Sequence, residues 1–321
     1  MPNPKYNPSV LDGVKMCKQH NIDVILSVGG GSVLDCSKAI AGGAKYDGEP
    51  WDLITYKAKT KDTLPIVDII TLAATGSEYD AGGVISRTET NDKTCYSDPH
   101  LYPKVSFLDP TYTFTVSKKQ TAAGVADAMN HIMEQYFCED STLLNDGFME
   151  AGLRSLMING RKCLENPEDY KARAEMMLVC TYGCNGIYSL GNSESGWPCH
   201  GMEHALSAYY DITHGEGLAI ITPRWMKHIL SEKTVDRFVK YGVNVFGIDG
   251  SLDKMTIANK AIDETYKFFE SINIPMHLKD VGIDEVRIDE MAKHVADNEG
   301  LENAWAPLLQ EDIAAIFRAS L

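Results

Sequence analysis

The chain has 321 residues, of which 44% are hydrophobic and 23% are charged, so it is long enough to bury a core and to form about two domains. Its formal net charge of -15 repels phosphate backbones and anionic membrane surfaces, so we expect neither nucleic acid nor lipid as a partner. The longest apolar stretches, such as Val67 to Ala74, are far shorter than the roughly 18 residues that a membrane span needs. These numbers predict a soluble globular protein.

The N-terminus has no apolar segment and no small-residue cleavage site, so no signal peptide is expected. Eight cysteines are scattered along the chain, and no Cys-x-x-Cys motif occurs. Reduced thiols and a cytoplasmic location are therefore predicted.

Up to about residue 115, short β-branched runs alternate with helix-like segments, which is typical of crossover units on a parallel sheet. The clearest buried strand is predicted over residues 24–28. A glycine turn follows it, and then an amphipathic helix. Further strands are predicted over residues 66–72, 84–86 and 105–108.

From Ser117 onward strand signals nearly vanish, and helical patterns follow one another to the C-terminus. One apolar face runs from Ile257 to Ile272 and is stopped by Pro275. We therefore predict an α/β plus all-α chain: a Rossmann-like parallel-sheet domain over residues 1–115, followed by an all-helical domain over residues 116–321.

Two glycine turns follow predicted strands, at Gly29-Gly30-Gly31-Ser32 and at Thr75-Gly76-Ser77-Glu78. Glycines after a strand let the backbone approach a ligand closely, and the next helix offers free N–H groups to a phosphate. The first turn departs from the G-x-G-x-x-G pattern, because Leu34 stands at the third glycine position, so a tight turn without a ligand is the alternative. Two such turns on neighbouring strands would flank one crevice and favour a dinucleotide. Asp35 is expected to suit the dipole at the start of the helix.

Histidines and an aspartate recur at helical spacing in the second half. Asp127 and His131 lie four residues apart on one predicted helix, and His200 and His204 repeat that spacing on another. His214 follows where the next helix is predicted to begin. Imidazole and carboxylate together suit a divalent transition metal such as iron or zinc.

The same residues also allow a different interpretation, because His200-Gly-Met-Glu203-His204 matches the H-x-x-E-H pattern of inverzincin metalloproteases. That interpretation leaves Asp127, His131, His214 and both glycine turns unexplained. We therefore prefer the larger metal cluster.

Taken together, these motifs resemble the iron-containing (group III) alcohol dehydrogenase family, over essentially the whole chain. The particular forms are similar to its butanol dehydrogenase or NADPH-dependent aldehyde reductase branch. The segments that carry the resemblance are 29–38, 71–78, 84–87, 108–110, 124–131, 200–204 and 214–215.

The resemblance implies an enzyme that interconverts aldehydes and primary alcohols by hydride transfer with NAD(P)H, in a cleft between the two domains. It implies that Asp127, His131, His200 and His214 bind the metal, Fe²⁺ in the first place and Zn²⁺ as the alternative. It makes His204 the catalytic proton relay. The implied cofactor contacts are Gly30, Gly31, Ser32, Thr71, Asp80, Gly82, Lys93 and Tyr112.

The resemblance further implies NADPH rather than NADH, a small aliphatic aldehyde or alcohol as substrate, and a homodimer. Family members begin with a further segment that includes the first strands of the cofactor domain, so we expect an incomplete sheet with apolar surface left open. Two other functions stay open at this point: a lyase similar to 3-dehydroquinate synthase, and a noncatalytic remnant that only binds metal.

Overall fold

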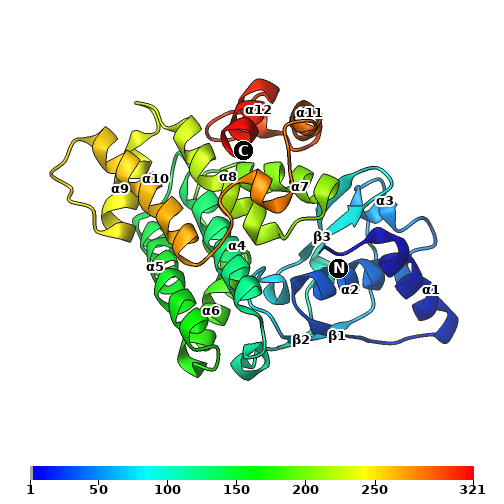
Figure 1. Cartoon of the computed structure of the whole chain (residues 1–321). Helices are drawn as coiled ribbons and strands as arrows, with labels where there is room; N and C mark the ends of the chain where they lie inside the picture. Colours follow the sequence, from blue (N-terminus) through cyan, green and yellow to red (C-terminus); the bar gives the residue numbers. More distant parts are fainter. Residues whose placement is uncertain (1–2) are drawn as a thin grey trace.

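The computed structural model describes residues 3–321 and places all strands before the long helices. Figure 1 shows the strand-containing part on one side and a larger body of helices on the other. The first part holds α1 (Leu11–His20), β1 (Ile25–Gly29), α2 (Gly31–Ala44), α3 (Trp51–Ile54), β2 (Ile66–Ile70), β3 (Gly82–Arg87), β4 (Asp92–Ser97) and β5 (Val105–Phe107). The helices that follow are α4 (Lys118–Tyr136), α5 (Leu143–Glu165), α6 (Tyr170–Gly183), α7 (Pro198–Tyr210), α8 (His214–Ile229), α9 (Val235–Phe246), α10 (Lys254–Ser271), α11 (Ile288–Asn298) and α12 (Gln310–Ala319).

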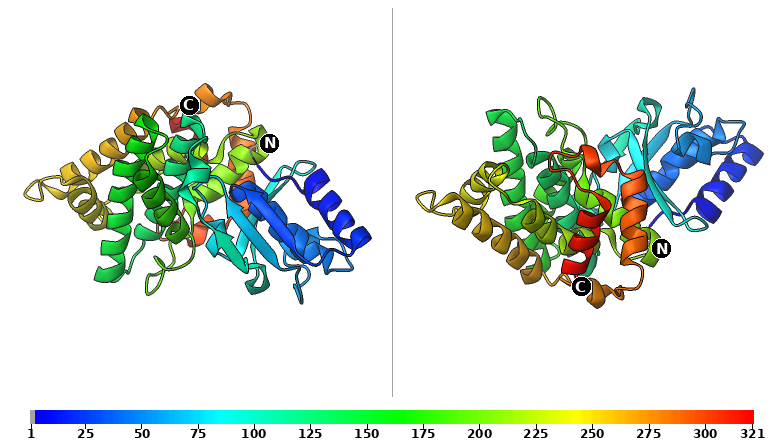
Figure 2. Two further views of the ribbon diagram at one scale, coloured as in Figure 1. Left: turned by 90° about the horizontal axis from the view of Figure 1, so that it is seen from below. Right: turned by 90° about the horizontal axis from the view of Figure 1, so that it is seen from above.

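The predicted fold class is confirmed: a parallel sheet lies in an α/β part, and helices make up the rest of the described residues. The sheet has the order β1-β2-β5, and both strand pairs are parallel. The views in Figure 2 show helices and sheet from two further sides. Because the sheet is parallel, β1 and β2 both end at the same edge, and the two glycine turns leave the sheet there.

One predicted strand has a different partner from the one expected. The strand predicted at residues 84–86 is β3, and it pairs antiparallel with β4 in a separate two-stranded sheet. It therefore does not extend the parallel sheet. Strand β4 was not predicted, because its polar sequence Asp-Lys-Thr-Cys-Tyr-Ser lacks an apolar run.

The prediction that residues 24–28 form a buried strand is wrong about burial. One face of the sheet packs through Ile25, Ile66 and Ile70 against a cluster that includes Leu34 of α2. On the other face, Leu26 is 61% exposed and Phe107 is 53% exposed. The register aligns Leu26 with Val67 and Val105, and Val28 with Ile69 and Phe107. We call these six residues the open sheet face.

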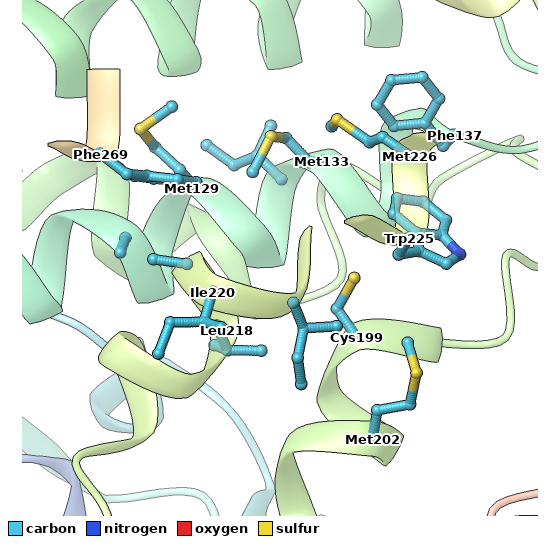
Figure 3. Close-up of a cluster of buried hydrophobic side chains, with 14 of the residues drawn as sticks. Met129, Met133, Phe137, Cys199, Met202, Leu218, Ile220, Trp225, Met226 and Phe269 are labelled. Atoms are coloured by element: carbon cyan, nitrogen blue, oxygen red, sulfur yellow. The ribbon is translucent and has the colours of Figure 1, made fainter. Parts of the chain in front are cut away.

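Helix α4 lies at the centre of the helical part and is buried at every position from Thr121 to Tyr136. It begins where Ser117 caps it by accepting a hydrogen bond from the backbone N–H of Gln120. Figure 3 shows Met129, Met133 and Phe137 beside side chains of α7 and α8 in the surrounding core. This packing fixes α4 rigidly, so side chains on its opposite face have a defined place.

The helices expected to carry site residues are present. The helix predicted to carry Asp127 and His131 is α4. His200 and His204 share α7, and His214 is the first residue of α8. The apolar face predicted over residues 257–272 belongs to α10. None of the helices within residues 3–321 is long and apolar enough to cross a membrane.

Candidate metal and cofactor site

Four predicted ligands from three helices lie around the Asp127 carboxylate, and the ligand atoms of Asp127, His131 and His200 all lie within 4.8 Å of one another. The Oδ1 atom of Asp127 lies 3.6 Å from Nε2 of His131, 3.8 Å from Nε2 of His200 and 3.6 Å from Nε2 of His214. Asp127 and His131 come from α4, His200 from α7 and His214 from α8. The packing of these three helices thus places three imidazole nitrogens around one carboxylate oxygen.

The donor set fits a divalent transition metal. Within residues 3–321, Asp127 Oδ1 and His200 Nε2 are buried and have no hydrogen-bond partner, although buried polar atoms are nearly always paired. Ligand distances of about 2.1 Å in a tetrahedral site put neighbouring ligand atoms about 3.4 Å apart. The observed separations are close to that value, and nitrogen and carboxylate oxygen suit iron or zinc.

Charge and burial act differently on these groups: burial lowers the pKa of His200, but Glu134 and Asp127 raise it to about 10, so a metal would have to displace a proton from this ring. Burial disfavours the charged form of the Asp127 carboxylate, but neighbouring His131, His200 and His214 hold its pKa below its usual value. Burial lowers the pKa of His131 to about 4, so its ring is neutral near pH 7. A neutral imidazole and an ionised carboxylate are the forms that coordinate metals.

A second carboxylate, which the sequence analysis did not assign, supports His200. Glu134 of α4 contacts Nδ1 of His200 and also accepts hydrogen bonds from the backbone N–H groups of Cys199 and His200, at 2.5 Å and 3.2 Å. It therefore holds the first turn of α7 and turns Nε2 of His200 towards Asp127. Its only sequence signal is its place on α4, three residues after His131.

His204 lies beside the cluster but is not one of the converging groups. Its ring centre is 6.0 Å from that of His214, and its Nδ1 is 3.6 Å from Oε1 of Glu299. Both ring nitrogens are buried and lack a hydrogen-bond partner within the described part of the chain. The metalloprotease interpretation needs His204 as a ligand beside His200, whereas Asp127, His131 and His214 face His200 instead.

The two glycine turns adjoin each other, as predicted. Gly30 precedes α2 and lies against Leu72, while Gly31 lies against Thr75. Gly31 and Ser32 form the first turn of α2, and Thr71 follows β2 with its N–H bonded to the carbonyl of Gly29. The first turn of α2 therefore lies at the edge of the sheet, and a helix N-terminus is a common place for a phosphate.

Asp80, in the loop before β3, and Gly82, the first residue of β3, both contact the buried ammonium of Lys38. Lys38 Nζ donates to Oδ1 of Asp80 at 2.7 Å and to the carbonyls of Ser77 and Gly82 at 2.7 Å and 2.6 Å. The loop that follows the second glycine turn is therefore tied to α2.

The expected dipole role of Asp35 is wrong, because Asp35 lies beyond the first turn of α2. Instead it accepts hydrogen bonds from Ser77 Oγ at 2.7 Å and from Val84 N–H at 3.0 Å. Burial raises the pKa of Asp35 to about 6. Its function in the fold is to join α2 to the loop and to β3.

The last two predicted cofactor contacts come from elements other than the glycine turns. Lys93 of β4 reaches the helical part, where its Nζ donates to Glu203 at 2.8 Å and lies 3.1 Å from Nδ1 of His214. Tyr112 lies in the short helix Pro110–Thr113 and is about half exposed. Lys93 therefore borders the metal cluster, and Tyr112 is open to solvent.

Gly31 offers a direct test of the contact between the two turns. A Cβ at residue 31 would lie 2.3 Å from Thr75 Oγ1, so Gly31→Ala should push the turns apart. Overpacking costs about 1–3 kcal/mol, and we expect the KM for the nicotinamide cofactor to rise about tenfold or more. Metal affinity should not change.

The matched control for this test is Gly42→Ala on the same helix, where the nearest atom to a new Cβ is 3.6 Å away. Steady-state kinetics against cofactor concentration make the measurement. An unchanged KM in Gly31→Ala would contradict a cofactor site at this turn.

A parallel sheet with paired glycine turns, next to a buried His₃Asp cluster in a helical body, defines a metal- and nicotinamide-dependent class of oxidoreductase. Comparison with known proteins assigns the chain to one family within that class. Residues 121–321 match the C-terminal part of the Fe-containing alcohol dehydrogenase family, and residues 1–110 match iron-containing alcohol dehydrogenase. The chain belongs to the iron-containing alcohol dehydrogenase family, whose members interconvert alcohols and aldehydes with NAD(P)H and a metal.

Curated relatives and solved structures agree with this assignment. The chain is 47% identical to NADH-dependent butanol dehydrogenase A of Clostridium acetobutylicum, over 99% of this chain and 82% of the relative. It is 36% identical to the NADPH-dependent aldehyde reductase YqhD of Escherichia coli, over 92% of this chain and 77% of the relative. The crystal structure of NADH-dependent butanol dehydrogenase A from Thermotoga maritima matches with a TM-score of 0.94 at 36% identity, covering 100% of this chain and 81% of that one.

The family assignment bears on two of the alternatives to an alcohol dehydrogenase. It supports an oxidoreductase over a lyase similar to 3-dehydroquinate synthase and over a metalloprotease. The predicted family and the predicted kind of enzyme are confirmed.

Proposed function

We propose that this chain reduces small aliphatic aldehydes to primary alcohols at the cluster of Asp127, His131, His200 and His214. The observation that carries the proposal is the convergence of three Nε2 atoms on one orphaned carboxylate oxygen, at 3.6–3.8 Å. A metal held there supplies Lewis-acid polarisation of the aldehyde oxygen when hydride arrives from the nicotinamide. Fe²⁺ is the proposed metal, and Zn²⁺ is the alternative.

The surrounding residues have separate tasks in this proposal. Gly30, Gly31, Ser32 and Thr71 line the turns where the pyrophosphate would meet backbone N–H groups. The other proposed cofactor contacts are Asp80, Gly82, Lys93 and Tyr112. Since the chain carries a net charge of -15, local N–H groups and nearby lysines must hold this anionic ligand.

His204 is proposed as the group that passes a proton to the alkoxide product. Its buried ring borders the cluster without being one of the converging groups, and Glu299, 3.6 Å away, is partly exposed. Glu299 therefore extends the path from His204 towards solvent. A positioned proton donor of this kind is the usual means of completing a carbonyl reduction.

For the cofactor, the resemblance predicts NADPH, whereas butanol dehydrogenase A, at 47% identity, is named NADH-dependent. The name of that relative favours NADH for this chain.

We further propose residues 1–115 and 116–321 as the two domains, in agreement with the position of the last strand at Val105–Phe107 and of α4 at Lys118–Tyr136. A cytoplasmic homodimer completes the proposal; all eight cysteines are free thiols, which fits that location.

The test is to follow the absorbance of reduced nicotinamide with butyraldehyde, added Fe²⁺ or Zn²⁺, and either NADH or NADPH. We expect metal-dependent consumption that stops when a chelator removes the metal, and a higher kcat/KM with NADH. Stoichiometric bound metal without consumption would contradict the proposed reaction and would indicate a noncatalytic remnant.

A further inference from the structure

A buried charged cluster joins the two parts of the chain directly behind His214. Glu203 of α7 is fully buried, and its Oε2 accepts a hydrogen bond from Lys93 Nζ at 2.8 Å. The same Oε2 contacts Nδ1 of His214, and Oε1 accepts from Ser207 Oγ. Every partner of this carboxylate is therefore a hydrogen-bond donor, and Lys93 comes from β4 of the α/β part.

The neighbouring helix leaves space for this carboxylate. A Cβ at Gly217 of α8 would lie 2.8 Å from Cγ and 3.1 Å from Oε1 of Glu203. Any larger side chain at residue 217 would displace Glu203. Lys93 is also buried, so the cluster is screened from water and its charges interact strongly.

The contact with Glu203 determines which nitrogen of His214 carries the proton. Glu203 Oε2 is paired with the buried Lys93 ammonium at 2.8 Å, which is the contact of an ionised carboxylate. An ionised carboxylate only accepts hydrogen bonds, and therefore His214 Nδ1 must be the donor. The lone pair of a neutral ring is then on Nε2, which lies 3.6 Å from Asp127 Oδ1 and faces the proposed metal position.

Lys93 would have the opposite effect on His214 if Glu203 were absent. Its Nζ lies 3.1 Å from Nδ1 of His214, and an ammonium can only donate. Without the carboxylate, Lys93 would donate to Nδ1 and place the ring proton on Nε2. A protonated Nε2 cannot coordinate a metal.

We infer that Glu203 is a positioning residue that holds His214 in its metal-binding tautomer. It does so by accepting the hydrogen bond of the buried Lys93 ammonium, which would otherwise donate to His214. The inference rests on the proposed metal site. It also gives Lys93 a task that does not depend on bound nicotinamide. The tautomer of His214 in the helical part consequently depends on where Lys93, on β4 of the α/β part, donates its hydrogen bond.

The test measures metal affinity of the full chain by competition between protein and a chromophoric chelator for Zn²⁺, with Co²⁺ absorption as a report on ligand geometry. Loss of an outer partner of a metal ligand typically weakens binding about 10–100-fold, and we expect this for Glu203→Ala. Glu203→Gln keeps an acceptor for His214 and should lose less. The double variant Glu203→Ala with Lys93→Met should bind more tightly than Glu203→Ala alone, because the competing donor is gone.

Two controls separate positioning from a general loss of structure. Glu150→Gln removes a buried charge that contacts Tyr136 and Asn244, away from the ligands. Lys5→Met breaks another ion pair between the α/β part and the helical part, in which Lys5 Nζ lies 2.7 Å from Asp211 Oδ1. Both should bind Zn²⁺ like the unaltered chain, and circular dichroism reports the folding of each variant.

The outcomes distinguish this inference from the proposed function. If the unaltered chain binds no metal, both are wrong. If the unaltered chain binds metal, and both Glu203→Ala and Glu203→Gln bind it as tightly as the unaltered chain does, only the positioning role is wrong. A double variant that binds more weakly than Glu203→Ala would also overturn it, because Lys93 would then support the site directly.

Discussion

Replacing Asp127 with asparagine should remove the metal and lower turnover by about a thousandfold or more. Asp127 supplies the oxygen around which His131, His200 and His214 converge, and an amide of the same size lacks its charge. Lewis-acid polarisation is worth several kcal/mol, and each 1.36 kcal/mol of barrier is a factor of ten in rate. The measurement is metal content by elemental analysis together with aldehyde reduction in the same preparation.

Glu150→Gln is again the matched control for Asp127→Asn, since it neutralises a buried carboxylate elsewhere on the helical part and should keep both metal and activity. Chelator treatment of the unaltered chain should reproduce the loss of activity seen in Asp127→Asn. Retention of stoichiometric metal by Asp127→Asn, with normal turnover, would show that the cluster is not the site of the reaction.

Replacing His204 with alanine should lower kcat about a hundredfold while metal content stays near that of the unaltered chain. A positioned proton donor contributes about 10²–10⁴-fold, and water entering the space left by the imidazole should recover part of the effect. The measurements are steady-state reduction of butyraldehyde and elemental analysis of the purified variant.

Added imidazole provides the check on a merely structural effect of His204→Ala, because it should restore part of the lost turnover by occupying the vacated space. A collapsed site would not respond to it. Loss of the metal from His204→Ala would exclude the relay role and would make His204 part of the metal-binding group.

The grouping of Asp127 with His131 could be predicted from the sequence because it is local, whereas the full set of four predicted ligands followed from the family resemblance. Asp127 and His131 share one helical face by spacing alone, and the start of α8 at His214 follows from the helical pattern. The supporting partners could not be predicted in the same way. Glu134 meets His200, and Lys93 meets Glu203, through contacts 66 and 110 residues apart in the sequence, and no local pattern records such pairings.

The fold shows the same division between local and long-range information. The apolar runs predicted β1, β2 and β5. Whether both faces of β1 are buried depends instead on which distant elements pack against them. Strand β4 has a polar sequence, and it is held by its pairing with β3 and by its contact with α7 rather than by an apolar pattern of its own. The position of Lys93 beside Glu203 and His214 therefore follows from the folded chain and not from the sequence pattern.

The open sheet face has a consequence for the colloidal behaviour of the chain. Leu26, Val28, Val105 and Phe107 form an apolar patch with water on one side, while the net charge of -15 keeps neighbouring molecules apart. Salt at 0.1 M confines that repulsion to about 10 Å but does not weaken apolar attraction. Raising the ionic strength therefore shifts the balance towards association through this patch, and dilute, low-salt solutions are the conditions in which single chains persist.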